Sequence, residues 1–591
     1  MQQNISMTSV LKHEQDRKIA PALRLSVGML GLMVTLPFLQ PTHHPPIPSF
    51  YEEWWAIAFG LLAIIAALNQ VPTRIAIPSI ALLPGVLLLA VIVQWLAGEV
   101  AIREYILFYG GYLAWATAMA SLGATLVERI GRTRLFDSLA VAVAAGALAS
   151  AVLAFAQWLR IGLPYQLMFP AIGGRIVANI AQPNLLATYL WTGIAAIIYL
   201  RERSGISPVL ATCGILLLGI AAGMTGSRTA LLHGCALALL SLLMPRITNP
   251  NSLHAERRYY LLAALAAVTI VGAVAQSAPG PQATLPIASA FDRWSARTVA
   301  GDARLDLWRD TVTIIRDHPW AGNGVGNYPW RMVEAAAVAP EGASTYPGIE
   351  HAHNLFLQLA ADFGMPLLVI VLFLGARWLV RMKRNGFESA NRWGIDVIVL
   401  LMVHSQFEYP LWNAEYLGLC AVVMGGLEHC RYFAENVRRH VLQFAFVAAA
   451  LALLPLRLDY GALDAASNLP PSKEPSQEDW RQRINIVAAL ALNSGIGAYA
   501  NLTLAILLEP DAKLAAAQSN VCERAKFLWP DPVIITRCAI LRQLGGRDAE
   551  ARELLTMVRR AFRDPTRQAA IRETLELSAK KIPRLTASGF Q

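Results

Sequence analysis

The stretch from Glu350 to Gly364 places two histidines and an amide, His351, His353 and Asn354, directly before an apolar run. Titratable groups at the start of a membrane helix are costly and usually serve chemistry or transport. An imidazole with an unperturbed pKa of about 6.5 can accept a proton from an attacking hydroxyl at neutral pH. The alternative is that Asn354 caps the following helix while the histidines form hydrogen bonds at the membrane interface.

A metal site at this stretch would need further ligands. No second paired motif such as H-E-x-x-H accompanies His351 and His353. Tetrahedral metal sites in proteins take three or four side-chain ligands. We therefore expect neither a metal nor another cofactor.

Two arginines follow glycine-containing turns, Arg175 after Gly173-Gly174 and Arg228 after Thr225-Gly226-Ser227. A planar guanidinium that is always charged suits the binding of phosphate oxygens. The alternative is that these arginines extend to lipid headgroups or pair with Glu99 or Glu104. Both interpretations place them on the outer side of the membrane.

Two further polar groups lie at the ends of apolar runs. Gln182 and Asn184 flank Pro183 at the start of one run, where they could cap a helix or contact a sugar. Glu408 and Tyr409 follow another run, ahead of Trp412. An aromatic belt at the membrane interface explains Trp412 well but Glu408 poorly.

The composition predicts a polytopic membrane protein. Of the 591 residues, 55% are hydrophobic and 15% are charged, and the mean hydropathy is +0.44. The net charge of +10 comes from Lys and Arg in short clusters between apolar runs. That distribution signals membrane orientation rather than nucleic-acid binding.

With about 17 to 25 apolar residues per span, we predict an all-α membrane protein with about thirteen transmembrane helices. The predicted limits are 22–40, 54–70, 75–97, 104–127, 135–159, 179–200, 207–224, 227–245, 259–277, 354–379, 393–408, 415–430 and 440–457. Basic residues concentrate in alternate short loops, which by the positive-inside rule places the N-terminus in the cytoplasm. The predicted location is therefore a bacterial inner membrane, with the polar groups above on its periplasmic face.

Five regions follow from this topology. They are a cytoplasmic tail (1–21), nine spans (22–277), a large periplasmic catalytic loop (278–353), four spans (354–457) and a periplasmic helical domain (458–591). In the last region Gly545-Gly546 separates two helical runs, as in helical-hairpin repeats, which more often bind partners than perform chemistry. Cys522 and Cys538 lie there too, and an oxidising compartment permits a disulfide between them.

Several motifs together carry a family resemblance over roughly residues 20–460. They are Ala181-Gln182-Pro183-Asn184, Gly226-Ser227-Arg228-Thr229, Arg304-Leu305-Asp306-Leu307-Trp308, His318-Pro319-Trp320-Ala321-Gly322-Asn323-Gly324, His351-Ala352-His353-Asn354 and Glu408-Tyr409-Pro410-Leu411-Trp412. Their order resembles the bacterial O-oligosaccharyltransferases of the PglL type, within the superfamily that also holds O-antigen ligases and polymerases.

The resemblance implies periplasmic transfer of a glycan en bloc from an undecaprenyl-diphosphate carrier to a Ser or Thr hydroxyl of a pilin or other periplasmic protein. It maps an essential histidine to His353 or His351, a glutamine to Gln182 and a tyrosine to Tyr409. Arg228 and Arg175 would hold the diphosphate, with Asn184, Glu408 and Asn354 nearby, and the expected reaction is inverting and metal-independent.

Three alternatives remain open at this point. An O-antigen ligase would perform the same chemistry on a lipid A-core sugar, and an O-antigen polymerase would join glycan units. A lipid-linked glycan transporter or flippase would instead show mid-membrane charges and inverted repeats. The polar groups gather at one face, which favours transfer over transport.

Overall fold

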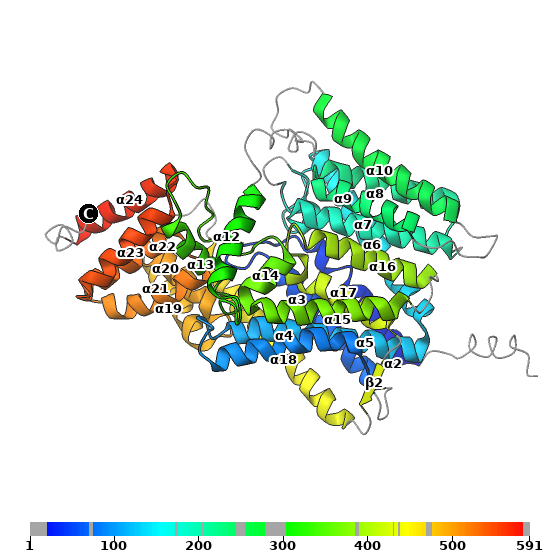
Figure 1. Cartoon of the computed structure of the whole chain (residues 1–591), viewed down its shortest axis with the longest axis horizontal. Helices are drawn as coiled ribbons and strands as arrows, with labels where there is room; N and C mark the ends of the chain where they lie inside the picture. The colour runs from blue at the N-terminus through cyan, green and yellow to red at the C-terminus, as the bar shows by residue number, and fades with distance from the viewer. Residues whose placement is uncertain are drawn as a thin grey trace, which may run out of the picture.

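The described part of the chain is almost entirely helical (Figure 1). The computed structural model describes residues 20–69, 75–171, 175–203, 205–243, 254–277, 303–383, 389–428, 431–434, 438–468 and 476–582. The predicted class, an all-α polytopic membrane protein, is confirmed.

The helices of the membrane region follow the predicted spans in order. Before the long loop they are α2 (Pro21–Met33), η1 (Pro37–Leu39), α3 (Phe50–Leu68), η2 (Ser79–Ala81), α4 (Leu82–Leu96), α5 (Tyr105–Ile130), α6 (Arg132–Trp158), η3 (Ala178–Ile180), α7 (Pro183–Glu202), α8 (Pro208–Met224), α9 (Arg228–Leu243) and α10 (His254–Ser277). After the loop they are α15 (Met365–Lys383), α16 (Ser389–His404), η4 (Pro410–Trp412), α17 (Ala414–Leu427) and α18 (Arg439–Ser467).

Within the described ranges, eight helical segments are long and apolar enough to cross a membrane. Three more helices of this region, α8, α9 and α17, are apolar but shorter. The predicted number of about thirteen spans therefore stays a prediction. A small antiparallel pair aligns β1 (Ile75–Pro78), at the start of the predicted span 75–97, against β2 (Arg431–Ala434), in a predicted loop.

The predicted span over residues 354–379 is wrong, because the chain breaks within it at Gly364. There α14 (Leu355–Phe363) ends and α15 begins. Gly364 has a φ of 84°, in the left-handed region that favours glycine. A Cβ at this position would also overlap the carbonyl of Trp320. The candidate membrane helix is therefore Met365–Met382 alone, and α14 is a separate short helix that follows His353.

Close helix contacts hold the membrane region together. The extensively packed pairs include α5 with α17, α6 with α7 and α8 with α10. At one crossing a Cβ on Gly425 would overlap the carbonyl of Ala120. Small residues let membrane helices approach this closely, which increases dispersion contacts in a medium where burial from water contributes little.

The C-terminal region is a row of helices at one end of the molecule, drawn in orange and red (Figure 1). It comprises α19 (Gln477–Asn493), α20 (Gly497–Leu507), α21 (Ala515–Leu528), α22 (Pro532–Leu544), α23 (Asp548–Ala561) and α24 (Pro565–Lys581). The predicted break at Gly545-Gly546 is confirmed, since it separates α22 from α23. Consecutive helices from α19 to α23 pack against one another and α24 packs on α22, as in helical-hairpin repeats.

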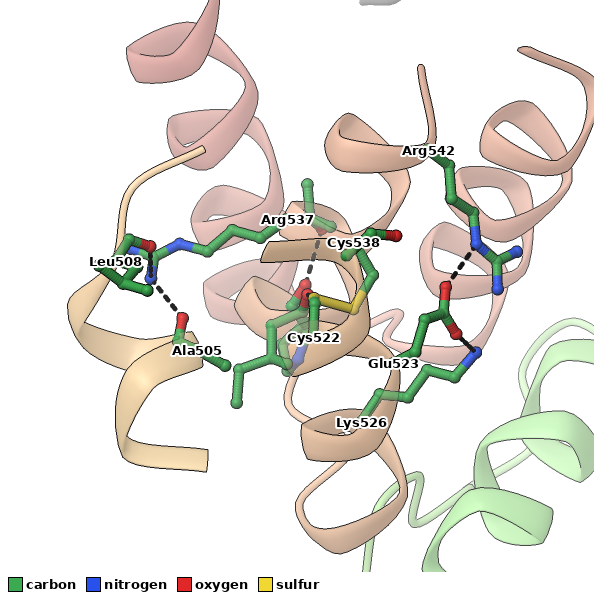
Figure 2. Close-up of a disulfide and its surroundings, with 12 residues drawn as sticks. Ala505, Leu508, Cys522, Glu523, Lys526, Arg537, Cys538 and Arg542 are labelled. Atoms are coloured by element: carbon green, nitrogen blue, oxygen red, sulfur yellow. Dashed lines mark hydrogen bonds and ion pairs between the residues drawn. A yellow bond between two sulfur atoms is a disulfide. The ribbon is translucent and has the colours of Figure 1, made fainter. Parts of the chain in front are cut away.

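A disulfide fastens the middle of this row. Cys522 of α21 is bonded to Cys538 of α22, as the sequence had permitted. Figure 2 shows its surroundings, where the Arg537 guanidinium donates to the carbonyl of Ala505 at 2.8 Å. Three adjacent helices are therefore tied by one covalent and several polar contacts.

The row packs against the segment that precedes the histidines. In that segment α12 (Ala303–Asp317) and α13 (Tyr328–Val338) lie in sequence before α14, and α13 packs on α23 and α21. The Trp330 ring of α13 lies 5.4 Å from the Phe527 ring, and the Arg563 guanidinium donates to the carbonyl of Pro340 just past α13. The repeat row therefore binds this chain's own loop.

Replacing both Cys522 and Cys538 with alanine is expected to destabilise the C-terminal row. The bridged positions are 16 residues apart, and closing a loop of about 15 residues stabilises by roughly 3 kcal/mol in the chain-entropy view. We expect a lower melting temperature for the purified protein in detergent, and the same loss in wild type under reductant. The matched control replaces two free exposed cysteines, Cys213 and Cys235, and should melt like wild type. Equal melting of both double variants would contradict the expectation.

Candidate active site

The carboxylate of Glu408 is the centre of the site. It accepts hydrogen bonds from three side chains that are far apart in sequence. His353 Nδ1 lies 2.9 Å from Oε2, while the Arg304 guanidinium and Asn184 Nδ2 lie 2.8 Å and 2.9 Å from Oε1. Because Glu408 is only 8% exposed, these donors are what makes its buried charge tolerable.

The backbone on both sides of His353 is fixed by hydrogen bonds. The carbonyl of Ala352 accepts from Trp308 Nε1 at 3.0 Å, and the Leu355 amide donates to the carbonyl of Ser405 at 2.8 Å. Between them His353 has a φ of 50°, a left-handed conformation that costs a non-glycine residue about 1 to 3 kcal/mol. The hydrogen bonds on either side therefore hold the His353 backbone in this uncommon conformation, and the imidazole lies beside Glu408.

A tight turn after α16 presents Glu408. The carbonyl of His404, the last residue of α16, accepts from the amides of Phe407 and Glu408 at 2.9 Å and 3.0 Å. The Arg304 guanidinium also lies 5.9 Å from the centre of the Phe407 ring. The turn thus places next to each other two groups that contact the Arg304 guanidinium, the Glu408 carboxylate and the Phe407 ring.

Asn184 joins Glu408 to the start of α9. Its Nδ2 donates to Glu408, and its Oδ1 accepts from Ser227 Oγ at 2.6 Å. Arg228 is the next residue and the first of α9, and it is partly buried. The predicted residues His353, Glu408, Asn184 and Arg228 are therefore connected through one chain of contacts.

Two of the predicted amides cap helices, which is the structural alternative that the sequence left open. Gln182 Oε1 accepts from the Leu185 amide at 2.6 Å at the start of α7. Asn354 Oδ1 accepts from the amides of Phe356 and Leu357, both at 3.1 Å, at the start of α14. These caps fix the first turn of α7, which carries Asn184, and the first turn of α14, which follows His353.

Arg175 lies in the segment that leads into η3, and it is partly buried. Since η3 packs against α7, this segment runs beside the helix that carries Asn184. Gln182 is two residues before Asn184 and so lies next to the group around Glu408, whereas a place for Arg175 beside that group stays a prediction.

His351 and Tyr409 pack against each other at the back of the site. The His351 ring lies 4.5 Å from the Tyr409 ring and 5.3 Å from that of Trp412. Burial, reinforced by the nearby His353, lowers the pKa of His351 to about 3. Burial and the charge of Glu408 raise the pKa of Tyr409 to about 12. At neutral pH His351 is therefore a neutral ring and a poor base, while Tyr409 keeps its proton.

The electrostatics of Glu408 are set by two opposing effects. Burial alone would raise the pKa of this carboxyl, but the hydrogen bond and charge of His353, the charge of Arg304 and the hydrogen bond from Asn184 outweigh it. The pKa of Glu408 consequently lies below its ordinary value. The carboxylate is ionised at neutral pH, so it accepts and His353 Nδ1 donates.

With Nδ1 engaged by Glu408, Nε2 is the ring nitrogen of His353 that remains to take a proton. The side chain of His353 is 23% exposed, so the imidazole is not sealed inside the protein. Among the described residues, no group of three or more His, Cys, Asp or Glu side chains is arranged to hold a metal ion. What the site offers is a base oriented by a carboxylate, next to guanidinium groups.

Arg304 was not among the candidates predicted for the site. It opens the Arg304-Leu305-Asp306-Leu307-Trp308 motif, so a signal was present, but several arginines of the long loop were equally plausible. Ser227 was also missed, although it directly precedes Arg228. Both are recognised only when Glu408 and Asn184 are seen as their partners.

Models of three sequence families match different parts of this chain, and the residues of the candidate site are spread over all three matches. A family described as protein glycosylation ligase matches residues 176–200, and one described as O-antigen ligase matches residues 213–372. A third, described as virulence factor membrane-bound polymerase, C-terminal, matches residues 393–575. Asn184 falls in the first, Arg228, Arg304 and His353 in the second, and Glu408 in the third.

Two curated proteins of Acinetobacter baylyi are similar over long stretches. A general O-oligosaccharyltransferase is 24% identical over 440 residues, which is 73% of this chain and 75% of the relative. A ComP-specific O-oligosaccharyltransferase is 24% identical over 307 residues, which is 51% of this chain and 52% of the relative. The chain is thus a membrane enzyme of the glycosyltransferase type. Its resemblance to PglL-type protein O-oligosaccharyltransferases, within the O-antigen ligase superfamily, is confirmed.

Proposed function

We propose that this enzyme transfers a glycan en bloc from an undecaprenyl-diphosphate carrier to a Ser or Thr hydroxyl of a periplasmic protein such as a pilin. The observation that supports it most directly is the His353–Glu408 pair at 2.9 Å, with Arg304 bound to the same carboxylate. A base beside guanidinium groups matches what transfer from a diphosphate to an alcohol requires. The similarity to O-oligosaccharyltransferases supports the same reaction.

In the proposed reaction the acceptor oxygen attacks the anomeric carbon of the glycan. Its proton passes to His353 Nε2, and the bond from the anomeric carbon to the phosphate oxygen breaks with its electron pair leaving on the diphosphate. Glu408 holds the imidazole with Nδ1 protonated and stabilises the imidazolium that forms. Attack from the side opposite the leaving group inverts the anomeric configuration.

Arg228 and Arg175 hold the diphosphate in this proposal, and Arg304 supplies further positive charge. Gln182, Tyr409 and Asn354 shape the surroundings in which donor and acceptor are oriented. Because a diphosphate is already a stable leaving group, positioning and charge stabilisation suffice and no metal step is required.

The active face is proposed to be periplasmic. Arginine and lysine residues concentrate on the opposite side by the positive-inside rule. The Cys522–Cys538 disulfide lies in the region that follows α18, and disulfides persist in oxidising compartments such as the periplasm. Both observations support an inner-membrane enzyme whose site and C-terminal row face outward.

The test of this function is reconstitution of the purified protein in liposomes with undecaprenyl-diphosphate-linked glycan and a pilin. We expect the pilin mass to increase by the mass of the whole glycan on a Ser or Thr. Movement of the lipid-linked glycan across the bilayer without a covalent product would overturn the proposal in favour of a transporter.

A second candidate function is O-antigen ligation, which the match of residues 213–372 favours. A deletion strain separates the two functions. Loss of protein glycans with unchanged lipopolysaccharide supports protein glycosylation, whereas loss of polysaccharide from lipid A-core supports the ligase.

Arg228→Gln is expected to raise the KM for the lipid-linked donor about tenfold or more, since a charged hydrogen bond contributes about 1.5 to 3 kcal/mol. Arg228→Lys should recover part of the lost donor affinity, because an ammonium keeps the charge but cannot form the bidentate hydrogen bonds of a guanidinium. The control is Arg103→Gln, an exposed arginine outside the site, which should leave the donor KM unchanged. A donor KM in Arg228→Gln equal to that of wild type would contradict the diphosphate role.

A further inference from the structure

A buried hydroxyl joins three helices directly beneath the site. Thr188 Oγ1 of α7 lies 2.9 Å from Nε2 of His233 in α9 and 2.8 Å from Nδ1 of His404 in α16. It also lies 3.0 Å from the carbonyl of Asn184. Thr188, His233 and His404 are each 0% exposed. We name these three residues the buried node.

Hydrogen-bond counting assigns the protons of the buried node. A hydroxyl has one hydrogen to donate and two lone pairs to accept. The carbonyl of Asn184 can only accept, so it takes the Thr188 hydrogen and both imidazoles must donate to Thr188. His233 therefore carries its proton on Nε2, and His404 carries its proton on Nδ1.

The far nitrogens of the two rings agree with this assignment. His233 Nδ1 and His404 Nε2 are buried without a hydrogen-bonding partner among the described residues. In the assigned tautomers these atoms are lone pairs, so every N–H of the buried node is paired. The opposite tautomers would bury two unpaired N–H groups, which is unfavourable because a buried donor without a partner loses its hydrogen bonds to water.

Each member of the buried node lies four or five residues, roughly one to one and a half helical turns, from a site residue on its own helix or the turn that follows it. The pairs are Thr188 with Asn184 on α7, His233 with Arg228 on α9, and His404 with Glu408 after α16. The last pair is also joined directly, because the Glu408 amide donates to the His404 carbonyl. A shift at the buried node would therefore move three site residues relative to one another.

We infer that Thr188, His233 and His404 are positioning residues for the proposed transfer reaction. They fix the spacing of α7, α9 and α16 so that Asn184 and Glu408 meet, and Glu408 in turn orients His353. This inference rests on the proposed function. A buried polar network in which all donors are paired favours one arrangement of its elements, and a misplacement of about 1 Å at a reacting group can cost about a hundredfold in rate.

The first test compares Thr188→Val, Thr188→Ser and Thr192→Val in the reconstituted transfer assay. Valine keeps the shape of threonine and removes the hydroxyl, so we expect kcat per folded molecule to fall about tenfold or more while KM for the donor changes little. Serine keeps the hydroxyl and should recover most of the activity. Thr192 is a matched control, since its buried hydroxyl donates to the carbonyl one turn back, that of Thr188, and links no other helix among the described residues.

The second test uses amides that mimic one ring nitrogen at a time. A Gln side-chain N–H takes the place of imidazole Nε2–H, and an Asn side-chain N–H takes the place of Nδ1–H. We therefore expect His233→Gln and His404→Asn to retain more activity than His233→Asn and His404→Gln. A role in packing alone gives no such crossed pattern.

The outcomes separate the inference from the function on which it rests. Folded Thr188→Val with wild-type kcat would overturn the inference and leave the proposed function intact. Equal inactivity of both amides at position 404, in folded protein, would also overturn it, because the ring itself would then be required. Absence of transfer by wild type would refute the proposed function, and with it the inference.

Discussion

Replacing His353 with alanine is expected to lower glycan transfer by about a hundredfold to ten-thousandfold while the protein still inserts and folds, since a general base contributes about 10² to 10⁴ in rate. The reason is geometric: His353 is the histidine whose Nδ1 is bound by Glu408 and whose Nε2 remains for the acceptor proton. The measurement is the initial rate of pilin modification in liposomes, normalised to folded enzyme.

Two histidine variants serve as comparisons for His353→Ala. His318→Ala changes an exposed residue of the same loop and should behave like wild type. His351→Ala removes a ring packed between Tyr409 and Trp412, so we expect a smaller loss than at position 353. If His351→Ala were the inactive variant and His353→Ala the active one, the two roles would have to be exchanged.

The length of the apolar runs predicted the membrane fold well. It gave a wrong span where the backbone conformation of one residue, Gly364, ends a helix. The run from 354 to 379 is largely apolar on both sides of Gly364, with Gln358 and Asp362 as the polar side chains between Asn354 and the glycine, and a glycine within a membrane helix is common. The break there follows from a positive φ and the nearby carbonyl of Trp320. Neither is visible in composition.

The C-terminal row shows a second limit of sequence reasoning. The glycine pair predicted a helical hairpin, and hairpin repeats suggested a separate binding partner. The structure instead packs α13 of the long loop on α21 and α23, through contacts such as Trp330 with Phe527. These residues are almost two hundred positions apart, and no local pattern links them.

Residue type and position at the ends of apolar runs made His353, Glu408, Asn184 and Arg228 candidates, and the family resemblance grouped them into one predicted site. Their pairing was not predictable, because a carboxylate at a membrane boundary has many possible donors. The buried node was missed for a different reason. Thr188 and His233 lie inside apolar runs, where a single polar residue is usually a satisfied interior group.

The pH dependence of stability follows from the lowered pKa of Glu408. A carboxyl whose pKa is lower in the folded than in the unfolded protein stabilises the fold fully above its unfolded pKa. That contribution is lost as the pH falls through the lowered folded value. The difference in melting temperature between wild type and Glu408→Gln should therefore be largest near neutral pH and shrink on acidification.

Glu408→Gln is expected to lower kcat about a hundredfold or more, although it changes the side-chain shape little. Glu408 accepts from three donors, His353, Arg304 and Asn184, whereas a glutamine has one accepting oxygen and an amide that donates. If that oxygen faces Arg304 and Asn184, the amide faces His353 Nδ1. The ring proton must then move to Nε2, the nitrogen that has to accept the proton of the acceptor hydroxyl.

The decisive comparison for Glu408→Gln is with variants that separate charge from hydrogen bonding. Glu408→Asp keeps the charge and should retain more activity than the glutamine variant, although its shorter side chain weakens the contact with His353. Glu350→Gln removes another carboxyl group from the same region, one that acts on His353 through charge and not through a hydrogen bond, and we expect its kcat to stay within about threefold of wild type. If Glu350→Gln lost as much activity as Glu408→Gln, general electrostatics would explain the loss. If Glu408→Gln kept wild-type kcat, the imidazole would not depend on this carboxylate for its tautomer.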